Sequence, residues 1–385
     1  MYIRQLRVTN YRSLKEVSIG SLSSLVVFYG ENDSGKSNIL ALLEHVFKQK
    51  YEEDVTEVSK GESLIQKRPS GFWRGVIDDF SDNFYNNTAE PITFSIRIRF
   101  FRREIKAIRT LPKKFFDALS RNAEYDHLEI SGQISSLGFD RATITLLTAK
   151  FNQKLFYDGN ASIEGSRYLP GFKELNATEK AETFERIMGS LDNAFARVSP
   201  DRFLGAEEEL DRVVQADLKP HSFKNWLFQI SIDRDKEKIF RQISQQFGNP
   251  PFAHGRILIA RVGNEIEAFV ENQDGLKLPI GRKGSGVQQI LMILSYVAAS
   301  NSPIIGIEEL EINLSPEKQA AIFNSLHKLV GTKDSPVTQI FLTTHSPHIA
   351  RRNEAERRGV WMANGETHVK RPREAEVTRF FRFLH

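Results

Sequence analysis

Cysteine is absent from all 385 residues of the sequence. This absence excludes folds held by disulfides, metal sites ligated by cysteine and catalysis by a thiol nucleophile. No apolar run approaches the roughly 20 residues that a membrane-spanning helix requires. The first 15 residues already carry four basic side chains, so a secretory signal is not expected. These absences favour a cytoplasmic protein without a membrane partner.

An excess of one charge is also missing, because 53 Lys and Arg oppose 49 Asp and Glu and leave a net charge of +4. The basic residues are unevenly placed, however. Residues 97–121 hold nine of them against two acidic residues, and residues 351–385 hold nine against five. Basic and phenylalanine residues alternate in the first segment, which suits a nucleic-acid backbone. A solvated strand and helix with aromatic residues facing the core explains the pattern equally well. DNA and an acidic protein are both candidate partners.

The hydrophobic pattern predicts strands and helices in alternation, which is typical of α/β proteins. Residues 50–90 are expected to be irregular, because Pro, Gly, Asn and Asp are scattered through them. The other expected elements are strands at 25–29, 304–307 and 339–343, and helices at 37–49, 178–193, 287–298 and 316–330.

The strongest signal is the stretch GENDSGKS from Gly30 to Ser37, which matches the phosphate-binding pattern GxxxxGK[ST]. It lies between a predicted strand and a predicted helix, where such a loop can direct its backbone N–H groups at phosphates. Lys36 is expected to bridge the β- and γ-phosphates, and the Ser37 hydroxyl to ligate Mg²⁺. ATP and Mg²⁺ are therefore the expected cofactors.

Two weaker motifs follow in the last third of the chain. Residues 302–309 form an apolar strand that ends in Glu308 and Glu309, a Walker B pattern. In that pattern the first carboxylate reaches Mg²⁺ and the second polarises the attacking water. Residues 341–346 place His345 at the end of another apolar strand. Each motif alone is weak, because buried strands often end in acidic turns and a lone histidine is more often structural.

A glycine-rich turn at residues 281–289 leads into the helix predicted for 287–298 and suits a second anion site. The order of the motifs is more informative than any one of them. It runs from phosphate loop to glycine-rich turn, paired carboxylates and histidine. This order resembles that of ABC-type ATPase heads and, among these, the RecF, SMC and OLD branch.

Four stretches carry the resemblance. Residues 3–14 are similar to the "x-N-F-R-S-L" start of that branch, and residues 30–38 to its P-loop variant. Residues 308–316 resemble its "E-E-P-E-x-H-L-H-P" stretch, and residues 343–347 match its "T-T-H-S-P". The resemblance implies an α/β P-loop NTPase fold, with an inserted mixed α/β and helical subdomain in the ABC-type head. The expected division is an ATPase lobe with the P-loop at 1–100, a partly helical insert at 101–250, and at 251–385 an ATPase lobe with the signature turn, Walker B, the switch histidine and a basic tail.

The resemblance also implies roles for individual residues. Glu308 takes the metal-associated position with Ser37, while Glu309 and His345 take the catalytic positions of the activating carboxylate and the γ-phosphate sensor. The segment 283–289 would reach across a dimer to the partner's ATP with a turn of three residues, because heads of this type hold two nucleotides between two subunits. That turn consists of Gly284, Ser285 and Gly286, and Gly284 stands where the family has serine. In the subunit whose phosphate loop holds the nucleotide, the resemblance implies eight nucleotide-binding residues: Arg12, Gly30, Asn32, Ser34, Gly35, Lys36, Ser37 and Asn38.

About 40 residues follow His345, too few for the Toprim nuclease domain that OLD nucleases carry after their ATPase. We therefore expect an OLD-like ATPase that forms a homodimer or higher homo-oligomer and hydrolyses ATP to ADP and phosphate. It would act as an ATP-gated clamp or sensor that controls a separate effector, a nuclease or toxin, in bacterial antiphage defence. Two alternatives remain open. One is a RecF-like DNA repair or replication ATPase that binds DNA through its basic insert, and the other is a scaffold that binds ATP without hydrolysing it.

Overall fold

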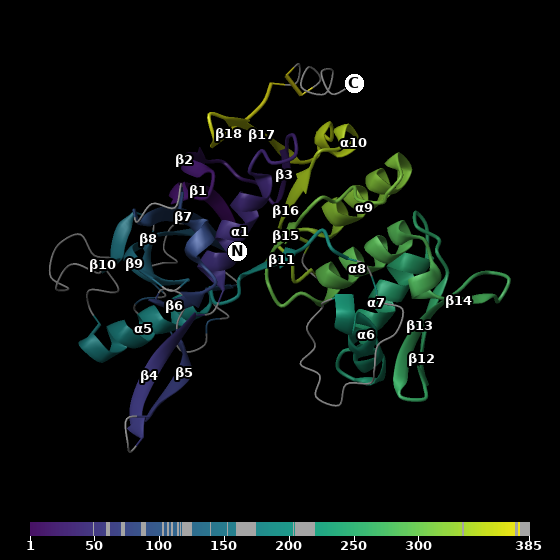
Figure 1. Cartoon of the computed structure of the whole chain (residues 1–385), viewed down its shortest axis with the longest axis horizontal. Coiled ribbons are helices and arrows are strands. Elements are labelled where there is room, and N and C mark those ends of the chain that lie inside the picture. The colour runs from purple at the N-terminus through teal and green to yellow at the C-terminus, as the bar shows by residue number, and fades with distance from the viewer. Residues whose placement is uncertain are drawn as a thin grey trace.

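Figure 1 shows the chain as a computed structural model in which three sheets are joined by helices. The residues that the structure describes are 1–48, 50–58, 62–70, 74–85, 90–101, 104–105, 108, 111–113, 115, 117, 125–138, 140–151, 153–158, 175–202, 204, 220–332, 335–373 and 376–377. None of the helices in these ranges combines the length and the apolarity needed to cross a membrane.

The first sheet is antiparallel and begins with the hairpin of β1 (Tyr2–Tyr11) and β2 (Leu14–Ile19). Strand β7 (Ile92–Phe101) pairs with β1, and the sheet continues through β8 (Tyr125–Gly138) and β9 (Arg141–Phe151). Every second side chain of β7 is buried, which is the pattern of a strand with one covered face. This sheet therefore has one face in the core and one polar face.

The prediction of irregular structure for residues 50–90 is wrong. β4 (Lys50–Val58) and β5 (Glu62–Ser70) form an antiparallel hairpin, which extends away from the rest of the chain at the lower left of Figure 1. β6 (Arg74–Asp78) and β10 (Lys154–Asp158) both pair with β9. Consecutive acidic residues hide any alternation in the sequence of β4. Backbone hydrogen bonds to a paired strand form the ladder whatever the side chains are.

The second sheet has six strands in the order β11, β15, β16, β3, β17, β18. All neighbouring strands are parallel except β17 and β18, which form an antiparallel hairpin. The loops that follow β3, β15 and β16 therefore leave the same edge of the sheet, the usual place for a ligand in such sheets. The strands are β11 (Phe195–Val198), β15 (Ile304–Ile307), β16 (Gln339–Thr344), β3 (Leu25–Tyr29), β17 (Glu356–Ala363) and β18 (Glu366–Lys370).

This second sheet separates two hydrophobic cores. Val26 and Phe28 of β3 belong to the core shared with helix α1 (Lys36–Phe47) and the first sheet, whereas Val27 belongs to the core on the opposite face. That second core includes residues of α8 (Ser285–Ala299) and others from α9 (Pro316–Leu329), α6 (Phe223–Ile232), α7 (Glu237–Gly248), β12 (Arg256–Val262) and β13 (Glu265–Glu271).

The remaining elements complete both sides of the sheet. α5 (Ala177–Gly189) packs into the first core, while β14 (Lys277–Pro279) pairs with β13 and the short α10 (Pro347–Ala350) follows β16. The predicted strand at 304–307 is confirmed, as are the helices near 37–49, 178–193, 287–298 and 316–330 apart from their ends. Strands β8 and β9, from the expected insert, extend the first sheet, and β11 extends the second.

The loop between β3 and α1 packs closely against the β17–β18 hairpin. A Cβ atom on Gly30 would lie 2.1 Å from the carbonyl oxygen of Val360. A Cβ on Gly35, whose φ is +94°, would lie 2.0 Å from Oγ1 of Thr367. Thr367 Oγ1 also lies within hydrogen-bonding distance of the carbonyl oxygen of Ser34, at 3.1 Å. Glycine is therefore required twice in this loop by close packing, and at Gly35 by the backbone conformation as well.

Replacing Gly35 by alanine should lower the free energy of unfolding by roughly 3 kcal/mol, because left-handed strain adds to the collision with Thr367. The matched control is Gly365→Ala, since Gly365 also has a positive φ, +75°, but has nothing within 4 Å of a new Cβ. This control should lose only about 1 kcal/mol. Urea unfolding of both variants measures the difference, and equal losses would contradict a rigid contact between loop and hairpin.

Candidate functional site

Lys36 is a buried cation at the start of α1. Only 6% of the residue is exposed, and its ammonium donates to the carbonyl of Gly30 at 3.0 Å, to the carbonyl of Glu31 and to Ser34 Oγ at 3.3 Å. Burial lowers the pKa of Lys36, while nearby carboxylates, that of Glu311 foremost, act in the opposite direction. A desolvated ammonium beside a helix N-terminus is stabilised by an anion, so the loop suits a phosphate group.

Ser37 and Glu308, which were predicted to hold the metal, are brought together. Ser37 Oγ donates to Oε2 of Glu308 at 3.2 Å, although 271 residues separate them in the sequence. Among the described residues, no group of three or more His, Asp or Glu side chains is arranged to hold a metal ion. Mg²⁺ fits a hydroxyl and one carboxylate nonetheless, because it prefers oxygen ligands and usually takes the others from phosphates and water.

The second oxygen of Glu308 belongs to an ion pair that the sequence did not reveal. Nε of Arg197, on β11, donates to Oε1 of Glu308, and Nη1 donates to Oε2 of Glu44 on α1 at 3.2 Å. Burial alone would lower the pKa of Arg197, but the hydrogen bond and charge of Glu308 and the charge of Glu44 outweigh it and raise that pKa. Arg197 thereby fixes one oxygen of Glu308 and leaves Oε2 toward Ser37.

Glu309 stands directly after the buried Glu308, in a left-handed conformation with φ of +45°. Its N–H donates to Oγ1 of Thr343 at 3.0 Å, and its carbonyl accepts from Nη2 of Arg202 at 2.9 Å. Because the backbone is held on both sides, the direction in which the Glu309 side chain leaves the chain is fixed. The partial exposure of this side chain leaves it accessible to a water molecule.

His345 is oriented by a third carboxylate. Its Nδ1 lies 3.1 Å from Oε1 of Glu311, which also accepts the backbone N–H of His345 at 2.6 Å. Thr344 Oγ1 donates to the other oxygen of Glu311 at 2.8 Å. An ionised carboxylate can only accept hydrogen bonds, so the contact with Glu311 favours the His345 tautomer that carries a proton on Nδ1. Nε2 of His345 is then left for a ligand. Glu311 was missed as a site residue, although its place in the acidic run after β15 could have revealed it.

Arg12 and Asn38, predicted to lie at the nucleotide, meet beside the loop. Arg12 donates to Oδ1 of Asn83 at 2.8 Å and to Oδ1 of Asn38 at 3.2 Å. Asn38 in turn donates to Ser13 Oγ at 2.8 Å, so the turn between β1 and β2 is attached to the start of α1. Asn32 is exposed in the loop. Arg12 and Asn38 are thus joined by a hydrogen bond two residues beyond Lys36 in the chain.

The predicted signature turn stands at the N-terminus of helix α8. Gly284 caps α8 without a side-chain hydrogen bond, and Ser285 is the first residue of the helix. A Cβ on Gly286 would lie 2.4 Å from the carbonyl oxygen of Asn313, so the turn packs on the loop that follows β15. No hydrogen bond in the described parts of the chain joins this turn to the phosphate loop. The N–H groups of Val287 and Gln288 donate to the carbonyl of Gly284, whereas those of Ser285 and Gly286 have no hydrogen bond among the described residues and could bind an anion.

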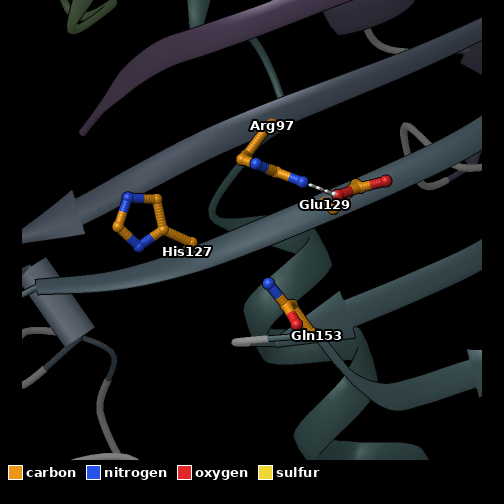
Figure 2. A pocket seen from close by; sticks show the side chains of 4 residues that line it. All are labelled: Arg97, His127, Glu129 and Gln153. Carbon is orange, nitrogen blue, oxygen red and sulfur yellow. Dashed lines mark hydrogen bonds and ion pairs between the residues drawn. The ribbon is translucent and has the colours of Figure 1, made fainter. Parts of the chain in front are cut away.

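A cavity of about 340 Å³ lies on the antiparallel sheet, and Figure 2 shows the four residues that line it: Arg97, His127, Glu129 and Gln153. Arg97 donates to Glu129 at 2.7 Å, so its charge is already paired. Burial lowers the pKa of His127, and the charges of Arg99 and Arg97 lower it further. Among the described residues that line this cavity, no lysine or arginine is left unpaired. Arg99, on the same strand as Arg97, donates to the hydroxyl of Tyr2 at 2.8 Å.

Six of the nine basic residues in the segment 97–121 lie outside the described residues: Arg102, Arg103, Lys106, Arg109, Lys114 and Arg121. The last residues of the basic tail, 378–385, also lie outside them. The interpretation of these segments as a DNA-binding surface stays a prediction.

Comparison with solved structures gives a fold likeness over the whole chain. The Smc head domain from Pyrococcus furiosus, bound to the C-terminal domain of ScpA, is 13% identical with a TM-score of 0.50, covering 100% of this chain and 99% of that one. The SMC head domain from Thermotoga maritima is 14% identical with a TM-score of 0.45, covering 97% and 100%. No curated protein matches the chain.

The predicted α/β P-loop NTPase fold of an ABC-type head is confirmed by the likeness to the Smc head domain from Pyrococcus furiosus. A family model described as "AAA domain, putative AbiEii toxin, Type IV TA system" matches residues 25–351. The match extends from the first residue of β3 to the residue after α10 and so includes the loop, the turn, both carboxylates and the histidine. The chain belongs to this AAA family of P-loop ATPases.

Proposed function

We propose that the protein binds ATP with Mg²⁺ and hydrolyses it to ADP and phosphate. One observation carries the proposal: Ser37 Oγ lies 3.2 Å from the buried carboxylate of Glu308, next to the ammonium of Lys36. A cation and a pair of oxygen ligands at the N-terminus of one helix are the groups that a nucleotide triphosphate and its metal require. Mg²⁺ would neutralise charge on the phosphates when bound.

The other residues of the site take complementary roles in this proposal. Backbone N–H groups from Gly30 to Ser37 surround the phosphates, with Asn32, Ser34 and Gly35 among them, while Arg12 and Asn38 flank the nucleotide. Glu309 accepts a hydrogen bond from the attacking water and polarises it. His345, held through Nδ1 by Glu311, presents Nε2 to the γ-phosphate.

We further propose that two copies of the chain complete each other's sites. The turn of Gly284, Ser285 and Gly286 opens α8 but has no hydrogen bond to the phosphate loop of its own chain among the described residues. The positive end of a 15-residue helix suits the γ-phosphate on a second copy. Closed pairs of this kind are symmetric, because each copy offers both its loop and its turn.

The closed pair would act as an ATP-gated clamp or sensor for a separate effector protein in bacterial defence. Two observations support this role. The family is described as a putative toxin of a type IV TA system, and an SMC head of the same fold has been solved with a partner protein, the C-terminal domain of ScpA. No contact in the described residues favours the RecF-like alternative, since six of the nine basic residues in the segment on which it depends lie outside them.

Two substitutions separate binding from hydrolysis. Lys36→Ala should abolish ATP binding, because it removes the buried cation of the loop. Glu309→Gln should retain ATP binding but lower turnover by about 100-fold or more, because the amide cannot act as a base for water. Phosphate release and the equilibrium affinity for ATP measure the two effects, with Glu265→Gln, at the exposed first residue of β13, as the control. Equal phosphate release by wild type and Glu309→Gln would refute the role of Glu309.

If each ATP site is composite, that is, formed by two copies of the chain, hydrolysis requires the two copies to associate. Ser285→Glu places a carboxylate where the γ-phosphate of the second copy would lie, so hydrolysis should stop while ATP binding at Lys36 persists. An equal mixture of Ser285→Glu and Lys36→Ala should recover about a quarter of the wild-type rate, because half the pairs are mixed and each has one intact site. Steady-state hydrolysis against protein concentration is the measurement. Specific activity that stays constant down to concentrations at which the protein is monomeric would exclude composite sites.

A further inference from the structure

Arg202 is a fully buried arginine that makes three hydrogen bonds, two of them to the loop that follows β15. It follows β11, which pairs in parallel with β15, and only 1% of it is exposed. Its Nη1 donates to the carbonyl of Glu308 and its Nη2 to the carbonyl of Glu309, both at 2.9 Å, while Nε donates to Oε1 of Gln289. Burial lowers the pKa of Arg202 to about 10, which leaves the guanidinium charged at neutral pH.

The two carbonyl contacts act on the conformation of Glu309. A left-handed φ is unfavourable for a residue other than glycine, so the surrounding structure must maintain it. Glu309 has such a φ, and the hydrogen bonds from Arg202 to its carbonyl and from its own N–H to Thr343 hold the peptide units on both sides. Removing either would let the Glu309 side chain change direction.

The third contact leads to the signature turn. Gln289 lies on α8 four residues after Ser285, so both are on one face of the helix, one turn apart. Gln289 is fully buried, and its Nε2 has no hydrogen-bond partner among the described residues. The hydrogen bond from Arg202 to Oε1 of Gln289 therefore links this side chain, through Arg202, to the carbonyl groups of Glu308 and Glu309.

We infer that Arg202 is a positioning residue that ties the backbone of Glu309 to the first turns of α8. When the second copy's phosphate seats on the turn at Ser285, α8 and Arg202 hold the catalytic carboxylate in its working direction. The planar guanidinium suits this task, because its fork of N–H groups reaches three acceptors at once and a lysine ammonium cannot reproduce that geometry. This inference rests on the proposed hydrolysis and on composite sites.

The test is Gln289→Met, which removes the link to α8 but leaves both carbonyl bonds of Arg202 and a side chain of similar size. We expect kcat to fall by about 10- to 100-fold, because displacement of a catalytic group by about 1 Å has effects of that order. The affinity for ATP should change by less than about twofold, since Lys36 and its loop are untouched. Pair formation with ATP, measured by light scattering, should also persist. Ser295→Ala is the control, because Ser295 is a buried α8 residue whose Oγ also has no hydrogen-bond partner among the described residues.

Arg202→Lys provides a second variant, which keeps the positive charge. It should likewise lower kcat while leaving the affinity for ATP nearly unchanged. A parallel loss of ATP affinity in both variants would mean that Arg202 only supports the fold and would overturn the inference. Unchanged kcat in Gln289→Met, with active wild type, would overturn it as well. A wild-type protein without Mg²⁺-dependent hydrolysis would instead refute the proposed function, so the two failures are distinguishable.

Discussion

A carboxylate buried at the end of a strand must find hydrogen-bond donors or positive charge inside the fold, because its desolvation is otherwise too costly. Glu308 is 3% exposed and meets this need with Ser37 on one oxygen and Arg197 on the other. Its carbonyl is held by Arg202. Helix α1, strand β11 and the loop after β15 therefore converge on one side chain, and the geometry of the phosphate loop depends on all three.

The same edge of the parallel sheet gathers the other groups. Glu309 and Glu311 follow β15, and His345 follows β16, the adjacent strand. Because parallel strands end together, residues from distant parts of the sequence reach one surface without any long loop. Hydrogen bonds from the backbone N–H of Glu309 to Oγ1 of Thr343 and from Oγ1 of Thr344 to Glu311 are then possible across adjacent strands. The histidine and the carboxylates consequently form one network.

The sequence allowed the local parts of this arrangement to be predicted. The loop from Gly30 to Ser37 has fixed spacing, and its flanking strand and helix show clear periodicity, so both were recognised. The hairpin at 50–70 was not, because strand pairing outweighs the intrinsic preference of its acidic residues. Arg197 and Arg202 could not be recognised either. Their roles arise from the pairing of β11 with β15, which brings together residues more than 100 positions apart and leaves no local motif.

Departures from the family pattern also have a structural reason. Leu310 occupies the position of a usual proline and is fully buried in the second core, where its side chain adds apolar contact. Asn313 replaces a usual histidine and has φ of +58°, a conformation that asparagine tolerates better than most residues. Its carbonyl lies against Gly286, so this position joins the loop after β15 to the start of α8.

The order of strands in the parallel sheet has a consequence for synthesis of the protein. β3 is made early, yet its two neighbours are β16 and β17, which lie about 310 to 340 residues later in the chain. Thr367, which supports Gly35, comes later still. While the nascent chain is shorter than this, β3 has neither neighbour and its apolar surface is exposed to chaperones. The contacts that Val360 and Thr367 make with the phosphate loop therefore become available only when translation has passed β18.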